Sequence, residues 1–84
     1  MSHVIDCTTI ESAAQLHQVL AQALRFPAWY GHNLDALYDC LTDIGEKTDL
    51  IFDHWTSMGS FSAGFLRVLM DAAEENPNLD ITIS

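Results

Sequence analysis

Apolar residues follow two different periods along the chain, and these periods predict its secondary structure. Three short runs, residues 4–7, 50–52 and 81–83, are rich in the β-branched and large apolar side chains that are typical of strands. Between the runs, apolar residues recur every three or four positions, which places them on one face of a helix. The three helical stripes span residues 16–24, 34–41 and 61–73.

Residues with capping preferences set the expected ends of the helices. Ser12 begins a capping-box pattern, and Asn33 supplies a side-chain oxygen at the start of the second helix. Pro27 is expected to end the first helix, because it has no N–H and disfavours helical geometry at the residue before it. Gly45 fits the end of the second helix. On this pattern His17 lies on the polar flank of the first helix.

The alternation of strands and helices indicates an α/β fold: a three-stranded parallel sheet with packed crossover helices, in β-α-α-β-α-β order. A chain of 84 residues suits a single domain, residues 1–84, and is too short for two. The second strand is apolar at each of residues 50–52, which predicts that it is covered on both faces of the sheet.

The charge of the chain narrows the classes of partner. Twelve Asp and Glu residues oppose three Lys and Arg residues, and the formal net charge is −9. Such a field repels nucleic acid and anionic membranes and attracts basic proteins. Direct binding of nucleic acid or of a membrane is therefore not expected. Solubility alone is an equally good explanation of the charge at this point.

The two cysteines, Cys7 and Cys40, lie far apart and form no CxxC pair. The chain opens without a basic region followed by an apolar run, so neither a signal peptide nor a membrane span is expected. Both features favour free thiols in a reducing compartment, and hence a cytoplasmic location.

The second predicted helix carries a row of carboxylates. Asp35, Asp39 and Asp43 stand at i, i+4 and i+8, and the row points about 150° away from the apolar stripe. Like charges at this spacing destabilise a helix by about 0.2–0.5 kcal/mol per pair. Asp43 is also disfavoured near the negative end of the helix dipole. Folding alone gives little reason for this row, which favours a role in binding.

Aromatic residues flank the acidic row. Trp29 and Tyr30 precede the helix, and Tyr38 lies between its apolar and acidic faces. Aromatic anchors beside charged groups are typical of the strongest contacts in protein interfaces. Tyr30 fits a core position better than an interface, whereas Trp29 and Tyr38 fit either role equally well.

The run PAWYGHNLDALYDCLT, residues 27–42, resembles the signature of the barstar family, bacterial inhibitors of the ribonuclease barnase. Barstar has PxYYGxNLDALWDCLT there. The similarity extends to Val4-Ile5, to residues 16–18 and to residues 80–83. Residues 44–65 are only weakly similar and form a shorter segment than in barstar.

The resemblance implies that the second helix and the loop before it plug the active site of a ribonuclease. Asp39 then matches the central aspartate, which binds the arginine and histidine cluster meant for substrate phosphate. Asp35 matches a contact to the base-binding loop of the enzyme, and Trp29 matches an aromatic that stacks near the catalytic histidine. The further positions matched to the partner surface are Asn33, Leu34, Tyr38, Asp43, Ile44 and Asp71.

Some of the matched positions depart from the family pattern. Tyr38 replaces a tryptophan, while Asp43 and Ile44 replace a glycine and a tryptophan. Asp71 stands on the third helix where barstar has a longer acidic residue. We interpret these changes as a different cognate enzyme with the same mode of inhibition.

The resulting functional hypothesis is a cytoplasmic, one-to-one inhibitor of an extracellular-type, guanyl-specific microbial ribonuclease, monomeric when free. Carboxylates on a rigid helix would accept bidentate hydrogen bonds from the basic groups of the enzyme. The alternative is a barstar-like module that binds a different basic protein or toxin, because any basic phosphate-binding pocket suits the same carboxylates.

Two other classes are less favoured by the sequence. An enzyme would need an acid–base set such as Asp35, Asp39 and His32, or Cys40 as a nucleophile, yet a carboxylate next to a thiol raises its pKa. Metal ligands would be expected at paired spacing, and the histidines are scattered. No catalytic residue, metal or cofactor is therefore expected. The histidines are His3, His17, His32 and His54.

Overall fold

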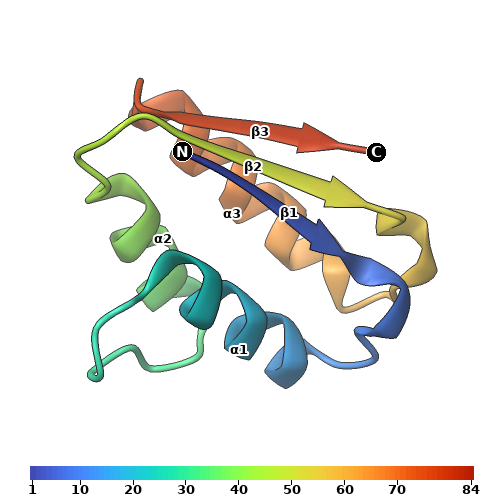
Figure 1. Cartoon of the computed structure of the whole chain (residues 1–84). Coiled ribbons are helices and arrows are strands. Elements are labelled where there is room, and N and C mark those ends of the chain that lie inside the picture. Colours follow the sequence, from blue (N-terminus) through green and yellow to red (C-terminus); the bar gives the residue numbers. More distant parts are fainter.

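The structure, a computed structural model, describes all residues from Met1 to Ser84. It confirms the α/β fold and the order β-α-α-β-α-β (Figure 1). Short 3-10 turns follow the first two strands. The elements are β1 (Ser2–Asp6), α1 (Ala13–Leu24), α2 (Leu34–Thr42), β2 (Thr48–Asp53), α3 (Ser62–Glu75) and β3 (Leu79–Ile83).

The three strands form one parallel sheet with β2 in the centre. Val4 pairs with Ile51, and Ile51 pairs with Thr82, so these three side chains share one face of the sheet. The chain advances across the sheet in one direction, and two right-handed crossovers then place the helices on the same side. Figure 1 shows α1 and α2 below the sheet and α3 behind it.

The prediction that the second strand is covered on both faces is wrong. Burial alternates along β2: Leu50 and Phe52 are fully buried, whereas Ile51 between them is only half-buried. Its neighbour Val4 on β1 is 62% exposed. The helices therefore cover one face, and the opposite face of the sheet is open to solvent.

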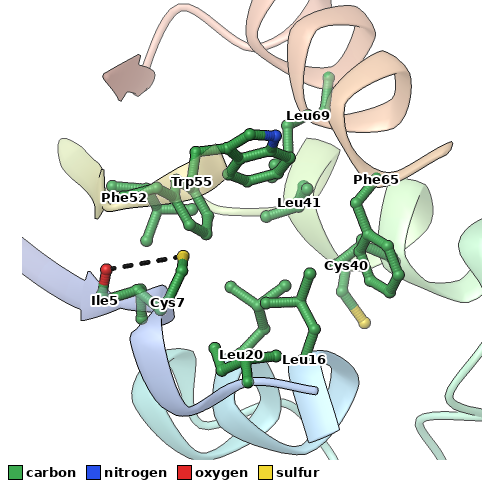
Figure 2. Packing of buried hydrophobic residues seen from close by; sticks show 14 of the residues in the cluster. Ile5, Cys7, Leu16, Leu20, Cys40, Leu41, Phe52, Trp55, Phe65 and Leu69 are labelled. Carbon is green, nitrogen blue, oxygen red and sulfur yellow. Dashed lines mark hydrogen bonds between the residues drawn. The ribbon is translucent and has the colours of Figure 1, made fainter. Parts of the chain in front are cut away.

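The core lies between the sheet and the three helices. Figure 2 shows residues of α1, α2 and α3 converging on Phe52 of β2 and on Trp55 just after it. The Phe52 and Trp55 rings meet edge to face, with their centroids 5.2 Å apart. The largest side chains with almost no exposure are Phe52, Phe65, Leu16, Leu20, Leu37, Leu41, Leu50 and Leu69.

The capping of α1 follows the prediction at its start and departs from it at its end. Ser12 Oγ accepts a hydrogen bond from the Gln15 N–H at 3.2 Å, which confirms the N-cap. The helix ends at Leu24, two residues before the position expected from Pro27. Arg25 follows in the left-handed conformation, at φ 55° and ψ 50°, and turns the chain away from the helix axis.

The helix α2 begins where Asn33 predicts and ends earlier than Gly45 predicts. Asn33 Oδ1 accepts from the Ala36 N–H at 2.8 Å. The end is set by a distant residue: the buried Asn76, just after α3, donates its side-chain N–H groups to the carbonyls of Leu41 (2.9 Å) and Ile44 (3.0 Å). Carbonyls at a helix end need such partners, so this contact stops α2 and ties it to α3.

Candidate functional site

The acidic row of α2 is on the surface of the molecule. Asp35, Asp39 and Asp43 are all exposed, and none of their carboxylates forms an ion pair or accepts a side-chain hydrogen bond. On the opposite side of α2, Leu37 and Leu41 are fully buried. The helix is thus held by its apolar face and presents three unpartnered carboxylates to solvent. Such groups are available to a basic partner without first breaking an internal contact.

The two aromatics before α2 point in opposite directions. Trp29 is 70% exposed, the largest exposure of any large hydrophobic residue in the chain. Tyr30 is buried, which confirms its interpretation as a core residue. Its ring packs against Phe26 at a centroid distance of 4.8 Å, and burial raises its pKa to about 12. Tyr30 anchors the loop, and Trp29 projects from it.

His17 contacts the hydroxyl group of Tyr30 and holds that side chain in place. Its Nδ1 lies 2.6 Å from the Tyr30 hydroxyl, and its ring packs 4.6 Å from the Phe65 ring. The expectation that His17 lies on a polar flank is wrong: the side chain is buried, because residues 27–32 fold over it. Burial, and to a smaller extent His32, lower the pKa of His17, which favours the neutral ring; the tautomer of that ring decides whether Nδ1 accepts the hydrogen bond from the Tyr30 hydroxyl or donates it.

The junction between the loop and α2 has little free space. Asn33 Nδ2 donates to the Gly31 carbonyl at 3.3 Å, and a Cβ at Gly31 would lie only 2.9 Å from that nitrogen. Leu34 is half-buried, and its Cδ1 lies close to Gly64 of α3. Asn33 and Leu34, both predicted as partner contacts, therefore also hold α2 in place.

A cavity of about 430 Å³ opens between the loop after α1 and the C-terminal half of α2. We call it the Trp29–Asp43 pocket. Predicted contact residues from both segments line it, so the structure brings together positions that lie up to fifteen residues apart in the sequence. Its lining includes Arg25, Phe26, Trp29, Asp39, Asp43 and Ile44.

Tyr38 and Asp71 meet on the other side of α2. Together with Glu74 and Glu75 of α3 they line a shallow hollow of about 280 Å³. Partial burial raises the pKa of Tyr38, and the carboxylates of Glu75 and Asp71 raise it further. The carboxylates of Asp71, Glu74 and Glu75 thus form a second acidic surface, which adjoins Tyr38 at the contact between α2 and α3.

The environment of Cys40 does not favour the nucleophile considered as an alternative. Cys40 is buried, and burial, Asp39 and Asp43 all raise the pKa of its thiol, which weakens it as a nucleophile. No group of three or more His, Cys, Asp or Glu side chains is arranged to hold a metal ion. Among the helices, none has the length and apolar character needed to cross a membrane.

Sequence reasoning missed several residues of this surface. Arg25 lines the Trp29–Asp43 pocket, and no motif singled it out. Glu74 and Glu75 were missed although they stand at i+3 and i+4 from Asp71, a spacing that places all three on one side of a helix. That spacing is the signal that would have found them.

The fold and this surface define the class of the protein: a barstar-like α/β protein with helices on one face of a parallel sheet and an exposed acidic helix. The family model described as Barstar (barnase inhibitor) matches residues 1–83, and the chain belongs to this family. A protein of Bacillus subtilis (strain 168), named "Putative ribonuclease inhibitor YrdF", is 38% identical over 77 residues. This match covers 86% of the chain and 85% of the relative.

Proposed function

We propose that the chain is a non-catalytic inhibitor of a small microbial ribonuclease, and that it inserts α2 and the Trp29 loop into the active site of the enzyme. One observation carries the proposal: α2 exposes three carboxylates in a row that have no internal partner, next to a tryptophan that is 70% exposed. Membership of the barstar family and the name of the Bacillus relative point to the same function.

The chemistry follows from what such an enzyme must do. A ribonuclease gathers Arg, Lys and His side chains to hold phosphates, and this pocket is preorganised for negative charge. Asp39, in the middle of the row, replaces the phosphate and accepts bidentate hydrogen bonds from arginine. Asp35 contacts the base-binding loop, and Trp29 stacks near the catalytic histidine, as the resemblance implies.

The internal contacts support a rigid binding surface. The Tyr30–His17 hydrogen bond holds the loop that carries Trp29, and Asn33 holds the first turn of α2. Because these groups are already fixed in the free protein, binding orders few additional side chains. The remaining contacts we propose are Asn33, Leu34, Tyr38, Asp43, Ile44 and Asp71.

We further infer a guanyl-specific, extracellular-type enzyme as the target and a one-to-one complex formed in the cytoplasm by a monomer. The net charge of −9 attracts a basic nuclease over long range and speeds their encounter, an effect that weakens with salt. A single exposed acidic helix on an 84-residue chain suits one active site at a time.

The experiment is a titration of the chain against a panel of guanyl-specific microbial ribonucleases, with RNA cleavage as the readout. Asp39→Ala is tested beside Asp53→Ala, which removes the same charge from the open face of the sheet. We expect stoichiometric inhibition by the parent and by Asp53→Ala, and inhibition at least about 100-fold weaker for Asp39→Ala. Losses of this size are those of close charge pairs in the barnase–barstar complex.

Two outcomes contradict the proposal. Equal inhibition by Asp39→Ala and the parent would place the interface elsewhere on the molecule. If no member of the panel is inhibited, the ribonuclease hypothesis fails and the second candidate takes its place: a different basic protein or toxin. The unpartnered carboxylates favour that candidate as well, since they suit any basic phosphate-binding pocket.

A further inference from the structure

The Trp29–Asp43 pocket is larger than the contact of Asp39 alone requires. It extends from Asp39 past the end of α2 to Ile44, and its other wall is the loop from Arg25 to Trp29. We propose that this pocket receives one arginine side chain of the ribonuclease, from the rim of its active site, and that Asp43 selects it. This inference rests on the proposed function and assigns a specificity residue within it.

The walls of the pocket suit the shape of arginine. Phe26 and Ile44 are half-buried and provide apolar surface for the aliphatic part of the side chain. The exposed Trp29 ring at the rim offers a face on which a planar guanidinium can stack. Lysine, with a compact and strongly hydrated head group, would gain less from both of these surfaces.

The electrostatics of the pocket favour a cation at Asp43. Asp39 and Asp43 lie one helical turn apart, and both line the pocket. Asp43 is the C-cap of α2, where the partial negative charge of the helix end accumulates. The last turn of α2 contains no basic residue, so the chain itself does not neutralise this end. A guanidinium from the partner would offset the charge of Asp43 and the partial charge of the helix end.

Arg25 limits the pocket to one such cation. It lines the same pocket, yet it forms no ion pair with Asp39 or Asp43. Its left-handed backbone, at φ 55°, is unusual for a residue other than glycine and fixes where the side chain begins. Two carboxylates and one guanidinium leave one net negative charge, which a single arginine neutralises. A second cation inside the pocket, beyond this arginine and the catalytic cluster that Asp39 faces, would be repelled by Arg25.

The pocket adjoins the acidic row of α2, and its proposed role, binding one arginine at Asp43, differs from that of Asp39. Asp39 can face the catalytic cluster of the enzyme with one side of its carboxylate, while Asp43 is one turn further from the start of α2. The volume of about 430 Å³ lies within the range of small-ligand pockets, about 300–1,000 Å³, so the pocket has room for one side chain.

The test compares Asp43→Asn with Asp53→Asn on the ribonuclease of the guanyl-specific panel that the parent inhibits most tightly. Both variants remove one charge and keep the side-chain shape, but Asp53 lies on the open face of the sheet. We expect the inhibition constant to rise about 10- to 100-fold for Asp43→Asn and less than about 3-fold for Asp53→Asn. Asp43→Asn removes a carboxylate from the negative end of a helix, so it will not unfold the protein.

A second readout identifies the partner group. In the parent and Asp43→Asn complexes, arginines of the nuclease are modified with phenylglyoxal and, in a parallel reaction, its lysines are acetylated; the modified residues are located by mass spectrometry. We expect one arginine that is protected in the parent complex and reactive in the Asp43→Asn complex. Arg25→Ala should leave that arginine protected and should allow a lysine or a second arginine to become protected as well.

The outcomes separate this inference from the proposed function. If the parent inhibits and Asp43→Asn behaves like Asp53→Asn, the pocket has no role and only this inference is overturned. If the group that loses protection in the Asp43→Asn complex is a lysine, the assignment to arginine is overturned. If the parent inhibits no ribonuclease of the panel, the proposed function and this inference both fail.

Discussion

The hydrogen bond between Tyr30 and His17 is the contact whose removal best tests how the Trp29 loop is held. The substitution Tyr30→Phe keeps the ring, which packs against Phe26 and His32, and removes only the hydroxyl group. His17 Nδ1, 2.6 Å from that hydroxyl, then has no partner in a buried site. No other polar side chain contacts this nitrogen.

The magnitude follows from the burial of both groups. A buried donor or acceptor that loses its partner costs about 1–3 kcal/mol, because its desolvation is no longer offset by a hydrogen bond. The dependence of unfolding free energy on urea is at the low end for a chain of this size, about 1 kcal/mol per M. The urea midpoint should therefore fall by about 1 M or more.

The assay is equilibrium urea unfolding at pH 8, where His17 is neutral, followed by circular dichroism. Tyr38→Phe is the matched control, since Tyr38 is a half-buried residue whose hydroxyl makes no hydrogen bond within the chain. It should change the free energy of unfolding by less than about 0.5 kcal/mol. An unchanged midpoint for Tyr30→Phe would refute the reasoning, because the loop would then be held by ring packing alone. Equal falls in the free energy of unfolding for Tyr30→Phe and Tyr38→Phe would also refute the reasoning.

Two further predictions concern stability. Burial lowers the pKa of His17 below its usual value of 6.5, so just below that pH the folded state binds fewer protons than the unfolded state. The contribution of His17 to stability should therefore be full above about pH 7. It should fall as the pH drops through 6.5 towards the folded-state pKa. Urea unfolding between pH 8 and 5 should show this slope in the parent and a flatter one in His17→Gln, and identical slopes would contradict the assignment to His17. Asn76→Ala removes three hydrogen bonds, to Leu41, Ile44 and Asn78, and should destabilise by about 2–3 kcal/mol, or about 10–20 °C in the thermal midpoint. A fall of less than about 3 °C would show that these carbonyls find other partners.

Local signals in the sequence predicted the elements of this fold well. Strand runs, apolar stripes and the caps Ser12 and Asn33 depend on residues within a few positions of one another, and all of them were confirmed. The end of α2 was not predictable in this way, because it depends on Asn76, which is more than thirty residues away. Neither was the open face of the sheet, since an apolar triplet such as residues 50–52 has the same pattern whether one face or both are covered.

The candidate site was predicted to a similar extent. The row on α2 and the exposure of Trp29 follow from helical spacing and from the resemblance to the barstar family. The burial of His17 and the position of Arg25 do not, because both depend on how residues 25–32 fold back over α1. A loop of this kind has no period from which its path can be inferred, and Arg25 adopts a backbone conformation that its residue type does not favour.

The open face of the sheet has a consequence for how the molecule behaves among its own copies. Both β1 and β3 are edge strands, and such edges invite pairing with other chains. Here Asp6 lies beside Asp53, and Asp49 beside Asp80, so carboxylates flank the apolar strip of Val4 and Ile51 on either side. Like charges on neighbouring strands oppose their pairing, and Lys47 Nζ, 3.2 Å from Asp80 Oδ2, offsets this at one of the two pairs. Stacking two molecules through this face would crowd eight carboxylates together, and the protein gives up some stability in exchange for resistance to aggregation.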